Sequence, residues 1–294
     1  MKRTQKNARL RWAGLFAAAI AVVAVVIPGQ LSVASAAPLD SQAGVSASVS
    51  PKPTIVLVHG AWADGSSFAP VTTALQLAGY TVLVAPNPLR GVVEDTKAVS
   101  DFINQRTSGP VILVGHSYGG VVITGAGLND PDVKALVYID GYAPDNGESA
   151  QQLTNVLPGS LLNVANPTTV FDFVLPAPDA PQALYDSYIK TDQYKAIFAA
   201  SLPSTVTKTL AAGQSPITLG ALGTPFSGTP AWKTIPSWFF IGTADKVLPP
   251  AEQQVMAARA HGKVTEANSP HLAMIAKPLQ VTGVIIDAAL HYSR

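Results

Sequence analysis

The sequence predicts an α/β fold with a mostly parallel sheet, helices on both of its faces and a lid insertion. Two observations lead to this prediction. Short β-branched apolar runs alternate with segments of helical periodicity in the first and last thirds of the chain. Between them, residues 141–230 break the alternation and are rich in Pro, Thr, Ala and Gln. A stretch of about 90 residues is too long for an ordinary loop, so we expect a lid with helices of its own.

The expected strands are apolar runs that stop at turn-forming residues, as buried parallel strands do. They are residues 54–58, 80–85, 111–115, 133–139, 237–241 and 263–267. The expected helices have apolar residues at helical spacing, and Gly79 is a good C-terminal cap for the first of them. They are residues 67–78, 93–107, 118–128, 250–261 and 279–292, with one more near 182–200 inside the insertion.

The N-terminus has the order of a secretory signal peptide. Five basic residues and no acidic one accompany the apolar run Trp12–Ile27, and the small residues Ala34 and Ala36 follow. We therefore expect residues 1–36 to be a removed signal peptide, 37–53 a flexible lead-in, and 54–294 a folded domain outside the cytoplasm. The alternative is an uncleaved membrane anchor, although the apolar run is short of the roughly 18 residues of a spanning helix.

Removal of the leader changes the net charge. The full chain has 19 basic and 18 acidic residues, and five of the basic ones lie in the leader. The remainder is slightly acidic and has no evident attraction for nucleic acid or for anionic lipid, so neither partner is expected. The chain has no cysteine, which excludes disulfides, a cysteine nucleophile and a lipoprotein anchor. Oligomeric state does not follow from composition.

Ser117 is the expected nucleophile. It lies in Gly115-His116-Ser117-Tyr118-Gly119, a Gly-x-Ser-x-Gly pattern between an expected strand and an expected helix. In that context the serine sits on a sharp turn that raises its hydroxyl above the sheet edge, and the glycines remove side chains that would collide there. Without this context the pattern is weak, because glycine-rich chains produce it by chance.

The base and the acid are expected later in the chain, at the ends of later strands. His271 follows the last expected strand and lies at the same sheet edge as Ser117. Asp245 follows the preceding strand, where a buried carboxylate could orient the imidazole and stabilise its protonated form. Asp140 also ends a strand and is the rival acid, but Asp245 better fits the order nucleophile, acid, base. Loop or helix-end positions explain the other histidines: His59, His116, His261 and His291.

Two backbone N–H groups are expected to bind the oxygen that becomes negative during acyl transfer. One belongs to Tyr118, directly after the nucleophile, and the other to Ala61, in the loop after the first strand. The side chains of His59 and Trp62 in that loop are interpreted as packing beneath the site. The sequence has no metal-ligand spacing, phosphate loop or dinucleotide fingerprint, so no metal or cofactor is expected.

Four motifs together resemble the α/β-hydrolase superfamily, and within it the bacterial secreted esterase-like group related to plant methyl esterases and hydroxynitrile lyases. They are His59-Gly60-Ala61-Trp62, the pattern around Ser117, Gly242-Thr243-Ala244-Asp245 and Ser269-Pro270-His271. The resemblance covers about residues 54–142 and 236–278 and leaves the lid uncovered. The plant lyases have lysine directly after the catalytic histidine, near the leaving cyanide. Leu272 stands there in this chain and counts against lyase activity.

The expected function is that of a serine esterase, which cleaves a carboxylic ester of a small, largely uncharged substrate through an acyl-enzyme. The alternatives are a small-molecule binding protein on the same fold, and another reaction of the same residues, such as amide or C–C hydrolysis or perhydrolysis. Nine apolar residues of the insertion fit a wall over the site and packing of the lid onto the body equally well. They are Leu153, Val156, Leu161, Leu162, Val170, Phe171, Phe173, Val174 and Leu175.

Overall fold

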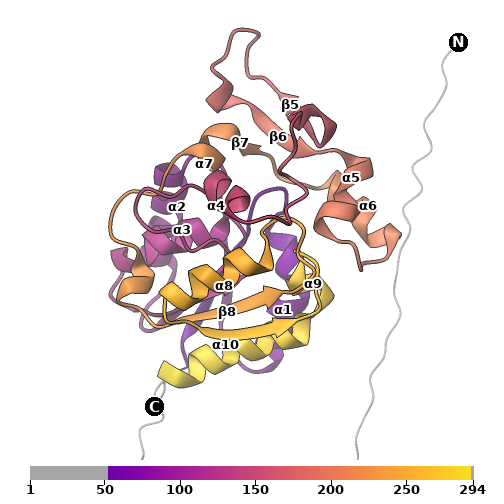
Figure 1. The fold of residues 1–294 in the computed structure, drawn as a ribbon. Coiled ribbons are helices and arrows are strands. Elements are labelled where there is room, and N and C mark those ends of the chain that lie inside the picture. The colour runs from indigo at the N-terminus through magenta and orange to yellow at the C-terminus, as the bar shows by residue number, and fades with distance from the viewer. Residues whose placement is uncertain (1–51, 293–294) are drawn as a thin grey trace, which may run out of the picture. The chain divides into compact units, whose positions relative to one another are not determined.

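The structure is a computed structural model that describes residues 52–292 (Figure 1). The signal peptide expected at residues 1–36 lies outside the described residues, as does the lead-in up to residue 51. In the part of the chain that is described, no helix has the length and apolar character needed to cross a membrane.

Six parallel strands form the central sheet, in the order β2-β1-β3-β4-β8-β9. Their bounds are β1 Thr54–Val58, β2 Val82–Ala85, β3 Val111–His116, β4 Val133–Ile139, β8 Ser237–Gly242 and β9 Lys263–Ala267. The sequence predicted all six, three of them with the same bounds and three within two residues. Strands β3 and β8 are buried along their full length, as expected for parallel strands between two helix layers.

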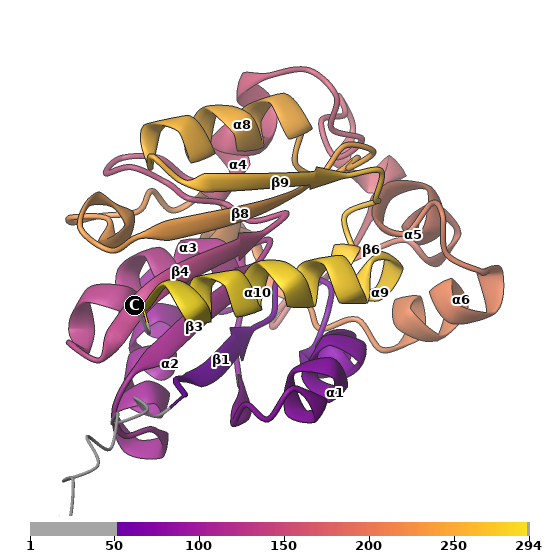
Figure 2. The ribbon, with the colours of Figure 1, turned by 90° about the horizontal axis from the view of Figure 1, so that it is seen from below.

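Helices cover both faces of this sheet (Figure 2). Helix α1 packs with α10 on one face, and α2 packs with α3 on the other. The helices of the body are α1 Ala69–Leu77, α2 Val92–Arg106, α3 Gly119–Ala126, α8 Pro250–Arg259, α9 Ala273–Ala276 and α10 Pro278–Tyr292. All except the one-turn helix α9 were predicted within two residues at each end.

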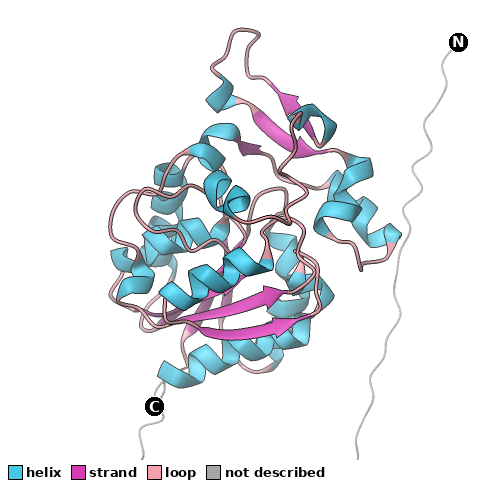
Figure 3. Cartoon of the chain, viewed as in Figure 1, coloured by secondary structure: helices cyan, strands magenta, loops and turns pink. Residues whose placement is uncertain are grey.

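The insertion between β4 and β8 contains helices, as expected, and also an antiparallel sheet that was not predicted (Figure 3). Its elements are α4 Ala150–Val156, β5 Phe171–Val174, β6 Asp186–Ile189, α5 Thr191–Phe198, α6 Ser204–Ala212, β7 Ile217–Thr218 and α7 Leu219–Gly223. The helix predicted near 182–200 was wrong over its first half, since α5 begins only at Thr191. Strand β6 buries every second residue, which is the period of a strand.

The lid sheet is attached to the body at two loops. Arg90, between β2 and α2, forms an ion pair with Asp186 of β6, with 2.6 Å between the charged atoms. The backbone N–H of Trp62, in the loop after β1, donates to the carbonyl of Ser215 at 3.0 Å. The loop that carries the predicted oxyanion donor Ala61 is therefore held directly against the lid.

Candidate active site

Ser117 lies at the sharp turn between β3 and α3, and its φ of 52° is in the left-handed region. Residues other than glycine rarely adopt this conformation, so neighbouring contacts must hold it. The N–H of Ser117 donates to the carbonyl of Ile139 at 3.2 Å, and its own carbonyl accepts from the N–H of Tyr142 at 3.1 Å. Strand β4 and the segment after it thus fix the turn.

Two glycines allow other backbone segments to approach this turn closely. A Cβ on Gly119 would lie 2.4 Å from the carbonyl oxygen of Val58, at the end of β1. A Cβ on Gly60 would lie 2.6 Å from the Cβ of Ser117 itself. The loop after β1 therefore lies against the serine, which is where an oxyanion donor from that loop is needed.

Asp245 and His271 are hydrogen bonded to each other. The Nδ1 of His271 lies 2.7 Å from the Oδ2 of Asp245, and both side chains are fully buried. Because an ionised carboxylate can only accept, Nδ1 carries the hydrogen and a neutral ring has its lone pair on Nε2. Among residues 52–292, Nε2 has no hydrogen-bond partner. It is therefore free to accept a proton.

Three further donors hold the carboxylate of Asp245. The N–H groups of Val247 and Leu248 donate to Oδ1 at 2.7 and 3.1 Å, and the side-chain amide of Gln253 donates to Oδ2 at 2.9 Å. Gln253 belongs to α8, and its amide also donates to the carbonyl of Leu248 at 3.0 Å. Sequence reasoning missed Gln253, because no motif places an amide at this spacing after the acid.

His116 connects the turn of Ser117 to the loop of His271. Its Nε2–H donates to the carbonyl of His271 at 3.0 Å, and the two ring centroids are 4.8 Å apart. Burial lowers the pKa of His116 well below its ordinary value, and the neighbouring His271 lowers it further, so His116 stays neutral. Within residues 52–292 no hydrogen bond joins the Ser117 hydroxyl to His271. Bonds of this kind often tighten only when substrate binds.

Asp140, the rival acid, makes no hydrogen bond to His271. Its Oδ1 accepts from the N–H of Gly242 at 2.6 Å, and its Oδ2 has no hydrogen-bond partner in the described part of the chain. Burial raises the pKa of Asp140 well above its ordinary value, and the neighbouring Asp245 raises it further. Asp140, Asp245 and His271 each have one oxygen or nitrogen atom that could bind a metal ion, and these three atoms lie within 4.8 Å of one another. The proton on the Nδ1 of His271, which is donated to Asp245, and the raised pKa of Asp140 account for the close approach of these three groups.

The N–H groups of Ala61 and Tyr118, the two predicted oxyanion donors, make no hydrogen bond within residues 52–292. The phenol of Tyr118 is held from α2, since its hydroxyl donates to the Oδ2 of Asp95 at 2.9 Å. Burial raises the pKa of Asp95, although this hydrogen bond and two backbone N–H groups oppose the rise. The residue after Ser117 is thus anchored through its side chain, while its backbone N–H remains available.

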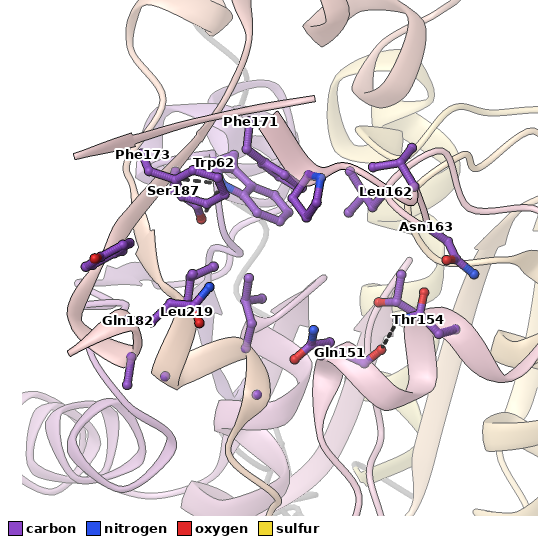
Figure 4. A pocket seen from close by; sticks show the side chains of 18 of the residues that line it. Trp62, Gln151, Thr154, Leu162, Asn163, Phe171, Phe173, Gln182, Ser187 and Leu219 are labelled. Atoms are coloured by element: carbon purple, nitrogen blue, oxygen red, sulfur yellow. Dashed lines mark hydrogen bonds between the residues drawn. The ribbon is translucent and has the colours of Figure 1, made fainter. Parts of the chain in front are cut away.

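His59 fits the packing interpretation, whereas for Trp62 that interpretation was incomplete. The Nδ1 of His59 donates to the carbonyl of Gly60 at 3.1 Å, and the ring is buried. The indole N–H of Trp62 instead donates to the carbonyl of Ser187 in β6 at 3.0 Å, and the ring lines a cavity under the lid (Figure 4). No local pattern marks this role, because Ser187 lies 125 residues further along the chain.

The cavity under the lid has a volume of about 770 Å³, and none of the lining residues among 52–292 is charged. Trp62 and Phe171 lie side by side on its wall, with ring centroids 5.4 Å apart. Ser117 and His271 do not line the cavity themselves. Tyr142 does, and its N–H donates to the carbonyl of Ser117, so the cavity adjoins the backbone of the turn.

The nine apolar lid residues fall into three groups, and only two of these groups fit the roles considered for them. Three line the cavity: Leu162, Phe171 and Phe173. Two are buried: Leu153 and Val170. Four are exposed: Val156, Leu161, Val174 and Leu175. The packing interpretation therefore fits Leu153 and Val170, three residues form part of a cavity wall, and the four exposed residues fit neither role.

The model of the alpha/beta hydrolase family matches residues 55–283. The chain belongs to the alpha/beta hydrolase family. This confirms the resemblance inferred from the four motifs and extends it across the lid, which those motifs did not cover.

Two curated relatives of this hydrolase carry names of ester-cleaving or hydrolytic enzymes. The carbendazim hydrolyzing esterase of Nocardioides sp. is 39% identical over 110 residues, which are 33% of this chain and 46% of the relative. The alignment thus spans less than half the length of that esterase. The pyrethroid hydrolase of Sphingobium wenxiniae is 27% identical over 252 residues, covering 80% of this chain and 87% of the relative.

Solved structures share the fold at low sequence identity. An extracellular α/β-hydrolase from a Paenibacillus species has a TM-score of 0.66 at 20% identity, covering 80% of this chain and 98% of that one. Polyneuridine aldehyde esterase has a TM-score of 0.67 at 16% identity, covering 81% and 99%. At such identities these similarities establish the fold of the hydrolase.

Proposed function

We propose that the protein is a serine esterase that cleaves a carboxylic ester of a small, largely uncharged substrate through an acyl-enzyme. One observation carries the proposal. The Nδ1 of His271 makes a buried 2.7 Å hydrogen bond to Asp245, and the Nε2 of the same ring has no hydrogen-bond partner among residues 52–292. His116 links this pair to the strained turn of Ser117. The names of the two curated relatives support an ester as the bond that is cleaved.

In the proposed mechanism the Oγ of Ser117 attacks the ester carbonyl carbon while the Nε2 of His271 takes the hydroxyl proton. Asp245 keeps the other proton on Nδ1 and stabilises the imidazolium that forms. The N–H groups of Ala61 and Tyr118 bind the oxygen as it becomes negative. The imidazolium gives its proton to the departing alcohol. A water molecule, deprotonated by the same ring, then attacks the acyl carbon, and the imidazolium returns a proton to the Oγ of Ser117 as the acid departs.

The cavity under the lid supports an uncharged substrate of modest size. A charged group bound there would meet no side chain of opposite charge, because none of the described lining residues is charged. The volume of about 770 Å³ falls within the range of sites for small molecules.

Export of the protein is the second part of the proposal. The order of basic, apolar and small residues supports a signal peptide at residues 1–36. The extracellular hydrolase from Paenibacillus, which has a similar fold, is consistent with a working place outside the cytoplasm.

A panel of p-nitrophenyl esters of rising acyl length, with wild-type protein and the Ser117→Ala variant, tests the activity. We expect hydrolysis of at least the short esters by the wild type and none above background by the variant. A folded wild type that binds esters but turns none over would overturn the proposal in favour of a binding protein.

A further inference from the structure

The cavity under the lid has two unlike sides (Figure 4). On one side the rings of Trp62 and Phe171 lie together, and the indole of Trp62 is fixed by its bond to Ser187. On the other side α4 presents Gln151. Gln151 is exposed, and its side-chain amide makes no hydrogen bond within residues 52–292, whereas the hydroxyl of the nearby Thr154 is hydrogen bonded to the hydroxyl of Tyr142 at 2.6 Å.

We propose that this cavity binds an uncharged group with an aromatic ring on Trp62 and Phe171 and a neutral hydrogen-bonding function directed at Gln151. A rigidly held indole offers a ring a large stacking surface. An amide both donates and accepts, so it matches a carboxamide, a hydroxyl or a carbonyl. A carboxylate or an ammonium group would find no opposite charge. The proposal rests on the proposed function in treating the bound group as part of the ester substrate.

Binding of 2-naphthamide and 2-naphthoate to the mature protein tests this inference without requiring turnover. The two probes have nearly the same shape and differ in charge. We expect the naphthamide to bind at least tenfold more tightly than the naphthoate, in titrations followed by NMR. Gln151→Met should weaken naphthamide binding by about fivefold to tenfold, and Gln280→Met, on the exposed face of α10, should leave it unchanged.

Equal binding of the two probes, or a Gln151→Met variant that binds like the wild type, would overturn the inference. Naphthamide binding of the expected selectivity in a protein that cleaves no ester would overturn the proposed function instead. The two failures are therefore distinguishable.

A second inference concerns Asp140, which is packed between the segments that carry Asp245 and His271. Its Oδ1 accepts the N–H of Gly242, three residues before Asp245. The N–H of Ala273, two residues after His271, also lowers the pKa of Asp140, against the larger effect of burial. Asp245 and His271 both approach this carboxyl, with ligand atoms of the three side chains within 4.8 Å of one another, and the Oδ2 of Asp140 has no hydrogen-bond partner in the described chain.

We propose that Asp140 is a positioning residue that stays uncharged and holds these two segments in register, so that Asp245 faces His271. An ionised Asp140 would place a second negative charge within 4.8 Å of Asp245, and two like charges this close disfavour ionisation of both carboxyls. Burial raises the pKa of Asp140, in agreement with the uncharged form.

The pH profile of ester hydrolysis by Asp140→Asn separates this role from a charged one. If Asp140 is uncharged, asparagine replaces one neutral group with another, and the pH at which activity rises stays within a few tenths of a unit. If it is ionised, removal of a negative charge this close to His271 shifts that pH downward by about 1 to 3 units. Asp140→Ala, which removes the acceptor for Gly242, should lower kcat by about tenfold with little change in KM.

A downward shift of a unit or more in Asp140→Asn, or wild-type kcat in Asp140→Ala, would overturn the inference. Urea unfolding of Asp140→Asn gives a second, independent measurement. With a raised pKa, native Asp140 binds more protons than unfolded Asp140, so wild-type stability falls as pH rises above the ordinary range of aspartate. Asparagine does not titrate, so this loss of stability is absent from the Asp140→Asn variant. The free energy of unfolding of the variant should therefore increase with pH relative to that of the wild type. A constant difference between the two proteins across that range would contradict the uncharged form.

Discussion

Replacement of Asp245 by asparagine tests the carboxylate with the smallest change in shape. Its Oδ2 accepts from His271 at 2.7 Å and from Gln253 at 2.9 Å, and its Oδ1 accepts from the N–H groups of Val247 and Leu248. Asparagine offers one acceptor oxygen and one NH₂ group in these two places. Whichever way it is turned, its NH₂ therefore faces N–H donors. If its oxygen keeps the backbone contacts, the NH₂ opposes the Nδ1–H of His271.

The ring of His271 then keeps its hydrogen on Nε2, which can no longer accept the proton of Ser117. We expect kcat to fall by about 10⁴-fold, which corresponds to about 5 kcal/mol of lost transition-state stabilisation. KM should change little, because Asp245 does not line the cavity. The assay is steady-state hydrolysis of a p-nitrophenyl ester, with thermal melting to verify the fold. Gln253→Met is the matched control, since it removes one donor but keeps the carboxylate, and it should cost less than tenfold in kcat.

An Asp245→Asn variant within tenfold of the wild-type kcat would refute this reasoning. If Asp140→Asn abolishes the activity of a folded protein while Asp245→Asn remains active, Asp140 is the acid and Asp245 is structural. Loss of folding in Asp245→Asn would show as a lowered melting temperature, and the milder Asp245→Glu variant would then supply the kinetic comparison.

The remaining predictions concern the base, the lid and the N-terminus. His271→Ala should lower kcat nearly as much as removal of the Ser117 hydroxyl, and wild-type activity should rise with pH as the imidazole loses its proton; a flat pH–rate profile would contradict this. Trp62→Phe keeps a ring but removes the 3.0 Å bond to Ser187, so urea unfolding should show a loss of about 1 kcal/mol, and an unchanged stability would contradict that bond. N-terminal sequencing of exported protein should begin near Ala37, whereas an intact Met1 in the membrane fraction would identify an anchor.

The central sheet could be predicted because each of its strands is marked locally. Strands β1, β4 and β9 were predicted with the bounds found, since each is a short run that ends at a turn signal. The lid sheet could not be predicted in this way. Strand β7 has only two residues, too few to show any period, and it pairs with β6 across about 30 residues of intervening chain. Pairing of that kind depends on packing against the body rather than on local pattern.

The proposed catalytic residues follow from the same rule. Ser117, Asp245 and His271 each lie just after a strand, and parallel strands end at one edge of a sheet. The contacts around them carry no such signal. The bond from Trp62 to Ser187 spans 125 residues and the bond from Gly242 to Asp140 spans 102, so only the folded chain reveals them.

Ser117 as the nucleophile is tested most directly by labelling with an active-site fluorophosphonate, followed by peptide mass spectrometry. We expect one label per chain on Ser117, and an unlabelled Ser117→Ala variant whose kcat is lower by about 10⁶-fold. A label on a different serine, or ester hydrolysis that survives in Ser117→Ala, would contradict the proposed mechanism.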